Sequence, residues 1–315
     1  MHHPIEILQL YPLSPSFEAA LASRFVVHKW QEIADKKGFV AEKGERIRAV
    51  VTGGHIGTEP LSGFDLPALE IVAINGVGTD KVDLAAARSK GIRVTNTPGI
   101  LAGDVADQAM ALLLALARQI PAADRYVRDG RWTPTRDFAL TRRVSGLRYG
   151  IAGLGAIGRK VAQRLAGFEG TIAYTARAPK ADSGYAFVAN LCDLAACSDV
   201  LIVCMPGGPK TDGAVSAEVL EALGPDGLLI NVSRGTVIDE PALLHALNDG
   251  TIAGAGLDVF MNEPHINPAF LANPRVVLTP HMASATVECR QQMADMVLAN
   301  LDAHFDRRPL VSAVI

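Results

Sequence analysis

Short runs of apolar residues recur along the first part of the chain, separated by mixed or glycine-containing segments. They read IEILQL, RFVVHKW, IRAVVTG, LEIVAIN and IRVTN, at residues 5–10, 24–30, 47–53, 69–75 and 92–96. Apolar runs of this length, bounded by turn residues, are typical of buried strands. Because segments of helical composition lie between them, we predict an α/β layer structure with parallel strands.

A second series of apolar runs begins at residue 148. It comprises RYGIAGL, TIAYTAR, DVLIVCM, GLLINVS, AGAGLDV and RVVLTP, at residues 148–154, 171–177, 199–205, 227–233, 253–259 and 275–280. Six strands separated by helix-length segments match the rhythm of a doubly wound dinucleotide-binding fold. We therefore expect two doubly wound parallel-sheet domains with a cleft between them, one a Rossmann cofactor domain and the other a flavodoxin-like substrate domain.

Two longer helices are predicted outside these strands. One covers residues 105–118, is capped by Asp104 and stopped by Pro121, and is apolar nearly all round, so it should be buried. The other covers roughly residues 285–305 and repeats apolar residues at a spacing of four. Because it follows the sixth strand, we expect it to return to the first domain. The predicted domains are then a discontinuous substrate-binding domain, residues 1–97 and 285–315, and a dinucleotide-binding domain, residues 98–284.

A glycine-rich loop, GLGAIG, lies directly after the first strand of the second series and directly before a helical segment. Gly153 permits a tight turn, Gly155 lets backbone amides approach a pyrophosphate, and Gly158 allows the helix to pack closely on the strand. The helix N-terminus then favours the anion. We predict a dinucleotide site here, which includes Ala156 and Ile157; a glycine-rich turn without a ligand is the alternative.

The segment IAYTARAPK, residues 172–180, bears on which dinucleotide binds. An acidic residue about 20 positions beyond the first glycine usually binds the ribose 2′-hydroxyl, whereas an arginine accommodates a 2′-phosphate. Here Thr175 occupies the expected position of the acid, and Arg177 and Lys180 follow it. We therefore predict NADPH rather than NADH. The alternative is that both cations are solvated charges at a strand end and that the cofactor is NADH.

Three polar residues, Arg234, Glu263 and His281, each follow the end of a predicted strand, where open α/β sheets gather their ligands. Reduction of a 2-oxo acid needs a cation for the carboxylate or the carbonyl, and an acid that protonates the oxygen. Arg234 suits the first task and His281 the second, with Glu263 orienting the ring and favouring its charged form. Taken singly, each is more often a structural or solvated residue, so the prediction depends on all three together with the glycine loop.

Two further polar residues stand in settings that suggest a role. Asp258 lies within an apolar strand, which is costly unless a nicotinamide carboxamide or a backbone N–H supplies a donor. His55 lies in a loop after a strand of the first domain and could face the cleft, although a loop histidine without a role is the more common case.

Composition narrows the class of partner. The 315 residues carry 30 basic and 33 acidic side chains, a net charge of −3 without a basic face for nucleic acid or anionic membrane. No apolar run is long enough to span a bilayer, and the N-terminus MHHPIEILQL lacks the features of a secretory signal, so we expect a cytoplasmic protein. The histidines show no metal-ligand spacing, and no metal is expected. The cysteines are expected to be buried free thiols: Cys192, Cys197, Cys204 and Cys289.

These motifs resemble the D-isomer-specific 2-hydroxyacid dehydrogenase family, and within it the NADPH-dependent glyoxylate/hydroxypyruvate reductases and the hydroxyphenylpyruvate reductases. The resemblance covers nearly the whole chain and rests on GVGTDKVD, TNTPGILAGDVAD, GLGAIG, NVSRGTVIDE, GLDVFMNEP and TPHMASAT, in this order. It implies that Arg234, Glu263 and His281 are catalytic, that His281 is the proton donor, and that a small 2-oxo acid is reduced to the D-2-hydroxy acid. A dinucleotide-sensing corepressor of the same family is the alternative.

The resemblance also implies contacts outside the catalytic set. The backbone amides of Val77 and Gly78 would bind the substrate carboxylate, in keeping with a glycine-flanked loop that can form an anion-binding nest. The implied cofactor contacts are Pro206 and Thr211 near the adenosine, and Val232, Asp258 and Ala283 near the nicotinamide.

Residues 120–147 resemble the dimerisation arm of the family, so we expect a homodimer. Trp132 and Phe138 would then be buried at the subunit interface, with packing inside one chain as the alternative.

Overall fold

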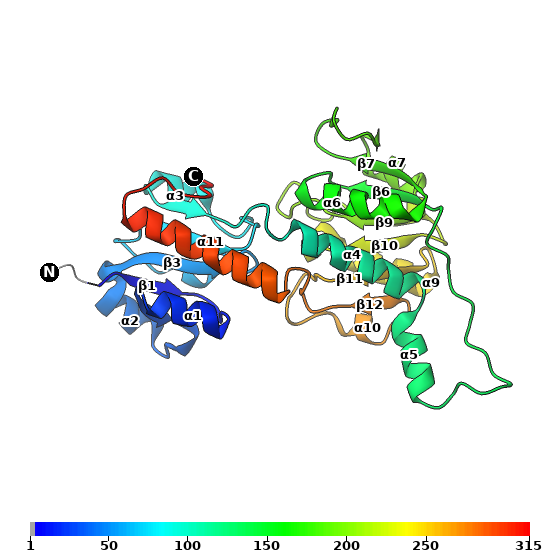
Figure 1. Ribbon diagram of the computed structural model, residues 1–315, viewed down its shortest axis with the longest axis horizontal. Coiled ribbons are helices and arrows are strands. Elements are labelled where there is room, and N and C mark those ends of the chain that lie inside the picture. Colours follow the sequence, from blue (N-terminus) through cyan, green and yellow to red (C-terminus); the bar gives the residue numbers. More distant parts are fainter. Residues whose placement is uncertain (1–3) are drawn as a thin grey trace. The chain divides into compact units, whose positions relative to one another are not determined.

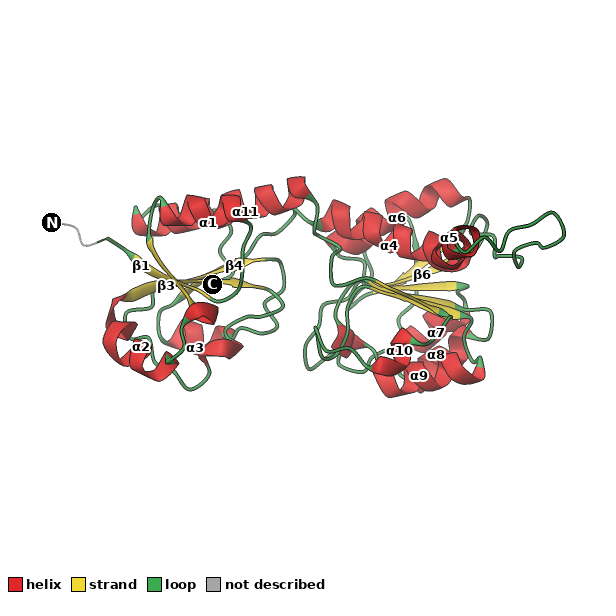
Figure 2. Cartoon of the chain, turned by 90° about the horizontal axis from the view of Figure 1, so that it is seen from below, coloured by secondary structure: helices red, strands yellow, loops and turns green. Residues whose placement is uncertain are grey.

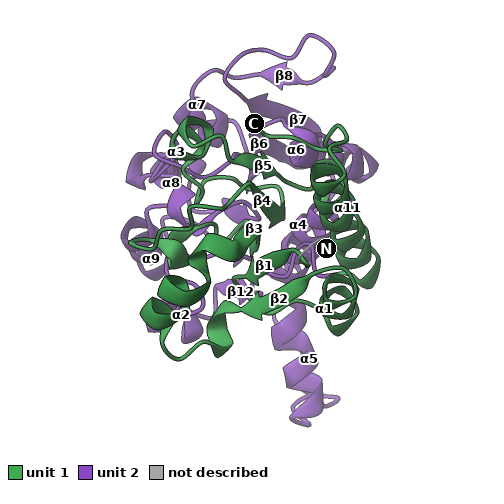
Figure 3. Cartoon of the chain, turned by 90° about the vertical axis from the view of Figure 1, so that its left-hand side faces the viewer, with its two compact units in different colours: residues 1–101, 286–315 green, residues 102–285 purple. Residues whose placement is uncertain are grey.

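The computed structural model describes residues 4–315, and the first three residues of the segment considered for a secretory signal lie outside this description. The chain forms two compact units, unit 1 (residues 1–101 and 286–315) and unit 2 (residues 102–285), which Figure 3 draws in two colours. Each unit is built on one parallel sheet, and Figure 2 shows helices on both faces of each sheet.

Unit 1 contains a five-stranded parallel sheet with the order β2-β1-β3-β4-β5, which confirms the flavodoxin-like arrangement. Its strands are β1 (Glu6–Gln9), β2 (Val26–Lys29), β3 (Ile47–Gly53), β4 (Ile71–Asn75) and β5 (Arg93–Thr95). Its helices are α1 (Pro15–Ala22), α2 (Lys36–Lys43), α3 (Leu84–Ser89) and α11 (Val287–Phe305). Each of the five predicted apolar runs contains one of these strands.

The core of unit 1 has two layers because successive side chains of a strand point to opposite faces of the sheet. Ile7 and Val51 pack in the layer that contains α1 and α11, whereas Leu8 and Val50 pack in the layer beneath α2 and α3. The C-terminal helix α11, which begins at Val287 after Thr286 caps it, therefore packs on the first sheet of the chain.

Unit 2 contains a seven-stranded parallel sheet with the order β12-β11-β10-β9-β6-β7-β8 (Figure 1). Its strands are β6 (Arg148–Ala152), β7 (Thr171–Thr175), β8 (Ala186–Phe187), β9 (Val200–Val203), β10 (Leu228–Asn231), β11 (Gly254–Leu257) and β12 (Val276–Leu278). Its helices are α4 (Ala102–Ala117), α5 (Ile120–Arg128), α6 (Ala156–Leu165), α7 (Leu191–Ala196), α8 (Ala217–Leu223), α9 (Glu240–Asp249) and α10 (Pro268–Leu271). The strand order reverses between β6 and β9, which makes that point the topological switch point of a doubly wound fold.

Three details of unit 2 differ from the sequence prediction. The sheet has a seventh strand, β8, which the six predicted runs missed because it is only two residues long and pairs with β7 alone. Helix α4 begins at Ala102, so Asp104 lies inside its first turn and not at the position before the helix. Pro121 does not stop α4 but lies in the first turn of α5, where proline is favoured, and Gln119 with φ of 50° separates the two helices.

The cysteines also depart from the prediction, since Cys289 alone of the four is fully buried. Cys192, in the first turn of the short helix α7, is half-buried, and Cys197, the residue that follows this helix, is exposed. Burial raises the pKa of the half-buried Cys204 to about 12, so its thiol stays protonated. All four are free thiols.

The segment that follows α4 extends away from the sheet as α5 and a long loop (Figure 1). Phe138 packs edge-on against Tyr126 of the same segment with ring centroids 5.4 Å apart. Trp132, by contrast, is 69% exposed.

Among residues 4–315, no helix combines the length and the apolar character that a membrane span requires.

Candidate active site

The glycine loop of unit 2 leads from β6 into α6 at the switch point of the sheet. Gly153 has a φ of 103°, and a Cβ atom built on it would lie 2.8 Å from the amide nitrogen of Met205. A Cβ atom on Gly158 would collide with the carbonyl oxygen of Gly153. Both positions therefore have the tight turn and the close packing that the sequence predicted.

The third glycine differs from these two. Gly155 is the residue before α6, and a Cβ atom on it would meet no atom of the chain within 4 Å. Open space therefore adjoins the first turn of α6, where the backbone amides of Ala156 and Ile157 stand. Free amides at a helix N-terminus fit the pyrophosphate of a dinucleotide.

Beyond β7, the residues that bear on cofactor choice separate into buried and exposed positions. Thr175 is 8% exposed, and its hydroxyl donates to the carbonyl of Ala189 at 3.2 Å. Arg177 and Lys180 are exposed, and the backbone amide of Lys180 donates to the hydroxyl of Tyr174 at 2.6 Å. The tyrosine thus fixes the course of the loop that carries both cations. Two accessible positive charges in such a loop suit a phosphate group.

An acidic residue, Asp182, lies just beyond the segment of residues 172–180, and it was not considered in the sequence analysis. Asp182 lies 2.9 Å from Arg159 of α6, and this hydrogen bond holds the pKa of the Asp182 carboxyl below its usual value. Arg159 is therefore a further cation, and it lies on the helix that follows the glycine loop. The two residues are 23 positions apart, so their pairing could not be read from either motif.

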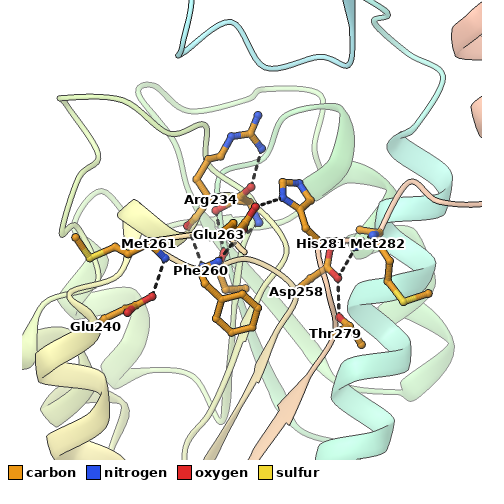
Figure 4. Close-up of polar contacts among 12 residues, drawn as sticks. Arg234, Glu240, Asp258, Phe260, Met261, Glu263, Thr279, His281 and Met282 are labelled. Atoms are coloured by element: carbon orange, nitrogen blue, oxygen red, sulfur yellow. Dashed lines mark hydrogen bonds and ion pairs between the residues drawn. The ribbon is translucent and has the colours of Figure 1, made fainter. Parts of the chain in front are cut away.

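His281 and Glu263 form a close pair at the carboxyl edge of the same sheet (Figure 4). The Nδ1 atom of His281 lies 2.6 Å from Oε2 of Glu263, and Oε1 of Glu263 accepts a hydrogen bond from the amide of Phe260 at 2.9 Å. One carboxylate oxygen thus anchors the glutamate to its own loop, while the other orients the imidazole. The Nε2 atom lies on the opposite side of the ring.

Asp258 holds the loop that carries His281. It is fully buried, and it accepts hydrogen bonds from the hydroxyl of Thr279 at 2.6 Å and from the amides of Met282 and Ala283, each at 2.9 Å. Its own carbonyl accepts from the amide of His281 at 2.8 Å. Burial raises the pKa of Asp258, and these hydrogen bonds act against that rise. The buried acid therefore finds its donors within the chain.

The backbone of His281 is in the left-handed region, with φ of 48°. A residue other than glycine adopts this conformation at a cost, so it persists where surrounding contacts fix it. The hydrogen bonds to Asp258 are such contacts. Gln108 of α4 extends the network, because its Nε2 atom donates to the Thr279 hydroxyl at 3.1 Å.

Arg234 follows β10 and is positioned by its own loop. Its backbone carbonyl accepts from the side chain of Asn231 at 3.0 Å, and its Nη1 atom donates to the carbonyl of Ser233 at 2.8 Å. Gly207 lies directly against it, since a Cβ atom there would be 2.6 Å from Cγ of Arg234. In Figure 4 the Arg234 side chain extends on the same side of the sheet edge as Glu263 and His281.

The loops of Arg234 and Glu263 are in direct backbone contact, because a Cβ atom on Gly235 would collide with the backbone of Phe260. Glu240 strengthens this junction. It is 9% exposed, and its Oε1 atom accepts from the amide of Met261 at 2.7 Å (Figure 4). Sequence reasoning missed Glu240, since an acid at the start of a helix ordinarily reads as a helix-stabilising charge. Two carboxylates thus bind consecutive amides of one loop.

The other predicted cofactor residues also lie beyond strand ends of unit 2. The carbonyl of the exposed Pro206, after β9, accepts from the hydroxyl of Thr211 at 2.7 Å. Val232, after β10, is 5% exposed, and Ala283, after β12, is 7% exposed. Each is therefore placed at the carboxyl edge that carries the glycine loop and the His281–Glu263 pair.

Val77 and Gly78 follow β4 at the carboxyl edge of the sheet in unit 1. Val77 is exposed, and its carbonyl accepts from the side chain of Asn96 at 2.9 Å. Within residues 4–315, no acceptor is bonded to the amides of Val77 and Gly78. Two consecutive amides of this kind can bind a carboxylate.

In chemical terms, unit 2 brings together a guanidinium group, an imidazole oriented by a carboxylate, and a glycine loop suited to a dinucleotide. Such a set can bind an anionic or carbonyl-bearing group and move a proton at Nε2 of the imidazole. No group of three or more His, Cys, Asp and Glu side chains within the described part of the chain is arranged to hold a metal ion.

Comparison with known proteins adds to this geometry. A model of the family described as "D-isomer specific 2-hydroxyacid dehydrogenase, NAD binding domain" matches residues 110–283. The chain is 44% identical to the hydroxyphenylpyruvate reductase of Plectranthus scutellarioides over 311 residues, covering 99% of both chains. It is 43% identical to the 2-ketogluconate reductase of Gluconobacter oxydans over 310 residues, covering 98% of both chains.

A solved structure is similar over almost the whole length. It is the NADPH-dependent glyoxylate/hydroxypyruvate reductase of Sinorhizobium meliloti in complex with NADP and malonate, with a TM-score of 0.91 and 40% identity. The match covers 99% of this chain and 97% of that one.

Proposed function

The chain belongs to the D-isomer specific 2-hydroxyacid dehydrogenase family and is an oxidoreductase, and from this premise we propose that it reduces glyoxylate, hydroxypyruvate or a related 2-oxo acid to the D-2-hydroxy acid with NADPH. The observation that carries the proposal is the pairing of His281 with Glu263 at 2.6 Å beside Arg234. The similar proteins named above, a hydroxyphenylpyruvate reductase, a 2-ketogluconate reductase and a glyoxylate/hydroxypyruvate reductase, support the class of substrate.

In the proposed mechanism, Arg234 binds the carboxylate or the carbonyl oxygen of the substrate through its guanidinium fork. The amides of Val77 and Gly78 bind the carboxylate, which is the contribution of unit 1. The dinucleotide, when bound, supplies a hydride to the carbonyl carbon.

His281 then donates the Nε2 proton to the carbonyl oxygen, and Glu263 holds the ring in the orientation and tautomer that this transfer needs. A general acid of this kind contributes a factor of about 10²–10⁴ to the rate. Glu240 acts through the loop that carries Glu263, so it is a positioning residue, and Asp258 also positions the loop that carries His281.

We propose that the cofactor contacts are Gly153, Gly155, Ala156, Ile157, Gly158, Arg177, Lys180, Pro206, Thr211, Val232, Asp258 and Ala283. A preference for NADPH is supported by the exposed Arg177 and Lys180 beyond β7 and by the buried Thr175 in the position of a ribose-binding acid. The similar reductase described as NADPH-dependent supports the same choice. An enzyme that prefers NADH is the alternative.

The test is a panel of initial rates with the purified chain, using glyoxylate, hydroxypyruvate, pyruvate and hydroxyphenylpyruvate, each with NADPH and with NADH at matched concentrations. We expect oxidation of NADPH with at least one of the first two acids. Equal or faster turnover with NADH would contradict the cofactor choice. No oxidation of either cofactor with any of the acids would contradict the reductase and favour a dinucleotide-sensing binding protein.

We further propose that the chain forms a homodimer through residues 120–147. Large apolar side chains are exposed along this segment, with Trp132 at 69% and Leu140 at 98% exposure. Such side chains, clustered in one arm, suit a subunit interface. Sedimentation should give twice the chain mass, and a Trp132→Ala and Leu140→Ser double variant should sediment as a monomer.

The free thiols are in keeping with a reducing, cytoplasmic location.

A further inference from the structure

Three neighbouring strands of unit 1 each place a polar or aromatic side chain at the same edge of their sheet. Tyr11 follows β1, His55 follows β3 and Asn75 ends β4. The strand order β2-β1-β3-β4-β5 reverses between β1 and β3, and ligands of open α/β sheets bind outside the carboxyl ends of the strands at such a switch point. Tyr11 and His55 follow the two strands that flank it, with their rings edge to face at 5.6 Å.

The Tyr11 hydroxyl is held as a hydrogen-bond donor. It accepts from the Nδ2 atom of Asn75 at 2.8 Å, so its own hydrogen points elsewhere, and within residues 4–315 no acceptor is bonded to it. Burial raises the pKa of Tyr11 to about 12, although the hydrogen bond from Asn75 and the charge of Arg290 act against the rise. The hydroxyl therefore keeps its proton at neutral pH.

Asn75 fixes the direction of this donor. It is 7% exposed, and its Oδ1 atom has no hydrogen-bond partner in the described part of the chain. A buried amide with an unpaired oxygen costs free energy of folding. Such a cost is typical of sites that are completed by a ligand or by ordered water.

Two glycines connect these side chains to the loop of Val77 and Gly78. A Cβ atom on Gly53 would lie 2.9 Å from Cε1 of His55 and 3.2 Å from Cζ of Tyr11. A Cβ atom on Gly54 would lie 3.0 Å from the carbonyl oxygen of Gly78. Gly53 and Gly54 thus join the aromatic pair to the proposed carboxylate site, and we call these residues together the wall of the site.

We propose that Tyr11 and His55, with Asn75 as a positioning residue, form a subsite that recognises hydroxyl groups on the carbon chain of the substrate, so that hydroxylated 2-oxo acids are preferred over their unsubstituted analogues. This inference rests on the proposed function, in which Val77 and Gly78 bind the substrate carboxylate. The rest of the acid then extends along the wall.

The chemistry of the wall favours hydroxyl groups over apolar ones. A substrate hydroxyl accepts from Tyr11 and can exchange a hydrogen bond with a ring nitrogen of His55. An alkyl or aryl group would leave the Tyr11 donor desolvated without an acceptor, and sites built to bind a hydroxyl discriminate strongly against analogues that lack it.

Hydroxypyruvate and pyruvate make the test, since they differ by one hydroxyl group. We expect Tyr11→Phe to lower kcat/KM for hydroxypyruvate about tenfold, mostly through KM, while kcat/KM for pyruvate stays within about twofold. His55→Phe keeps a ring but removes both nitrogens. It should likewise lower the ratio of kcat/KM for hydroxypyruvate to kcat/KM for pyruvate. Asn75→Ser should reduce the ratio less, because Tyr11 keeps its hydroxyl. The matched control is His245→Phe on α9, which should leave the ratio unchanged.

A second measurement does not depend on turnover. D-glycerate and D-lactate, the products of the two reactions, are compared as inhibitors of the wild type and of Tyr11→Phe, and the variant should lose affinity for D-glycerate alone. An unchanged ratio for both substrates and products in active variants overturns the subsite and leaves the reductase standing. A wild-type chain that reduces neither acid overturns the proposed function and this inference with it.

Discussion

Glu263 uses both carboxylate oxygens, one at 2.6 Å from Nδ1 of His281 and the other bonded to the amide of Phe260 at 2.9 Å. The glutamate is thereby fixed on its own loop, and its second oxygen orients the histidine ring. Its loop is bound a second time through Glu240 and Met261. This arrangement predicts that the charge of Glu263 matters for proton transfer more than for stability.

Glu263→Gln should lower kcat by about 10²-fold. The amide keeps the size of the side chain but removes the negative charge that fixes the tautomer of His281. The dissociation constant of NADPH, measured by fluorescence titration, should stay within about twofold of the wild type. His281→Asn should lose the same activity or more, and a Glu263→Gln enzyme that keeps the wild-type kcat and pH profile would show that the glutamate does not act through the histidine.

Gly207→Ala should displace the side chain of Arg234, because the added Cβ atom would lie 2.6 Å from its Cγ atom. Small displacements of a substrate-binding group cost up to about 10²-fold in rate, so we expect kcat/KM for the 2-oxo acid to fall by about 10–100-fold. Steady-state kinetics would measure this. Gly167→Ala is the control, since a Cβ atom there meets nothing within 4 Å. Equal kinetics in the two variants would remove Arg234 from the substrate site.

Arg177→Ala should raise the KM for NADPH by about 10–100-fold, since a charge-assisted hydrogen bond contributes about 1.5–3 kcal/mol. The KM for NADH should change by less than about threefold, because NADH carries no 2′-phosphate. Initial rates with the two cofactors measure the effect, and Arg308→Ala, at an exposed arginine near the C-terminus, serves as the control. A parallel loss with both cofactors would indicate that Arg177 supports the loop rather than the phosphate.

The features that could be predicted from the sequence are those whose causes are local. Apolar runs between glycines and charged turns place the strands, and the spacing of Gly153, Gly155 and Gly158 is sufficient for a strand, a tight turn and a helix. Parallel strands then bring their carboxyl ends to one edge, which is why His281 and Glu263 could be expected together although 18 residues separate them.

The features that were missed depend on contacts between distant segments. Gln108 bonds to Thr279 across 171 residues, and Tyr11 meets Asn75 across 64, so no motif contains either pair. Strand β8 has two residues and exists only because β7 offers it an edge. Asp258 was expected to need a hydrogen-bond donor. Whether backbone amides or a ligand supply it could be decided only once the position of the loop of residues 279–283 was known.

The hydrogen bonds between Asp199 and Arg148 predict how the stability of the folded chain depends on pH. Its Oδ2 atom accepts from the amide of Arg148 at 2.8 Å and its Oδ1 atom from the Arg148 guanidinium at 2.8 Å. The side-chain hydrogen bond from Arg148 holds the pKa of Asp199 below its ordinary value of 3.8. A carboxyl group whose pKa is lowered by folding stabilises the native state above the unfolded pKa, and this contribution is lost as the pH falls through the folded pKa.

Asp199→Asn should therefore lower the unfolding midpoint at pH 7 by about 2–4 °C, and the difference from wild type should shrink steadily as the pH falls below 3.8. Thermal unfolding followed by circular dichroism between neutral and acidic pH measures this, with Asp306→Asn at an exposed ion pair as a control that should change little. A difference of constant size through the acidic range would mean that packing, and not the charge of Asp199, stabilises this edge of the sheet.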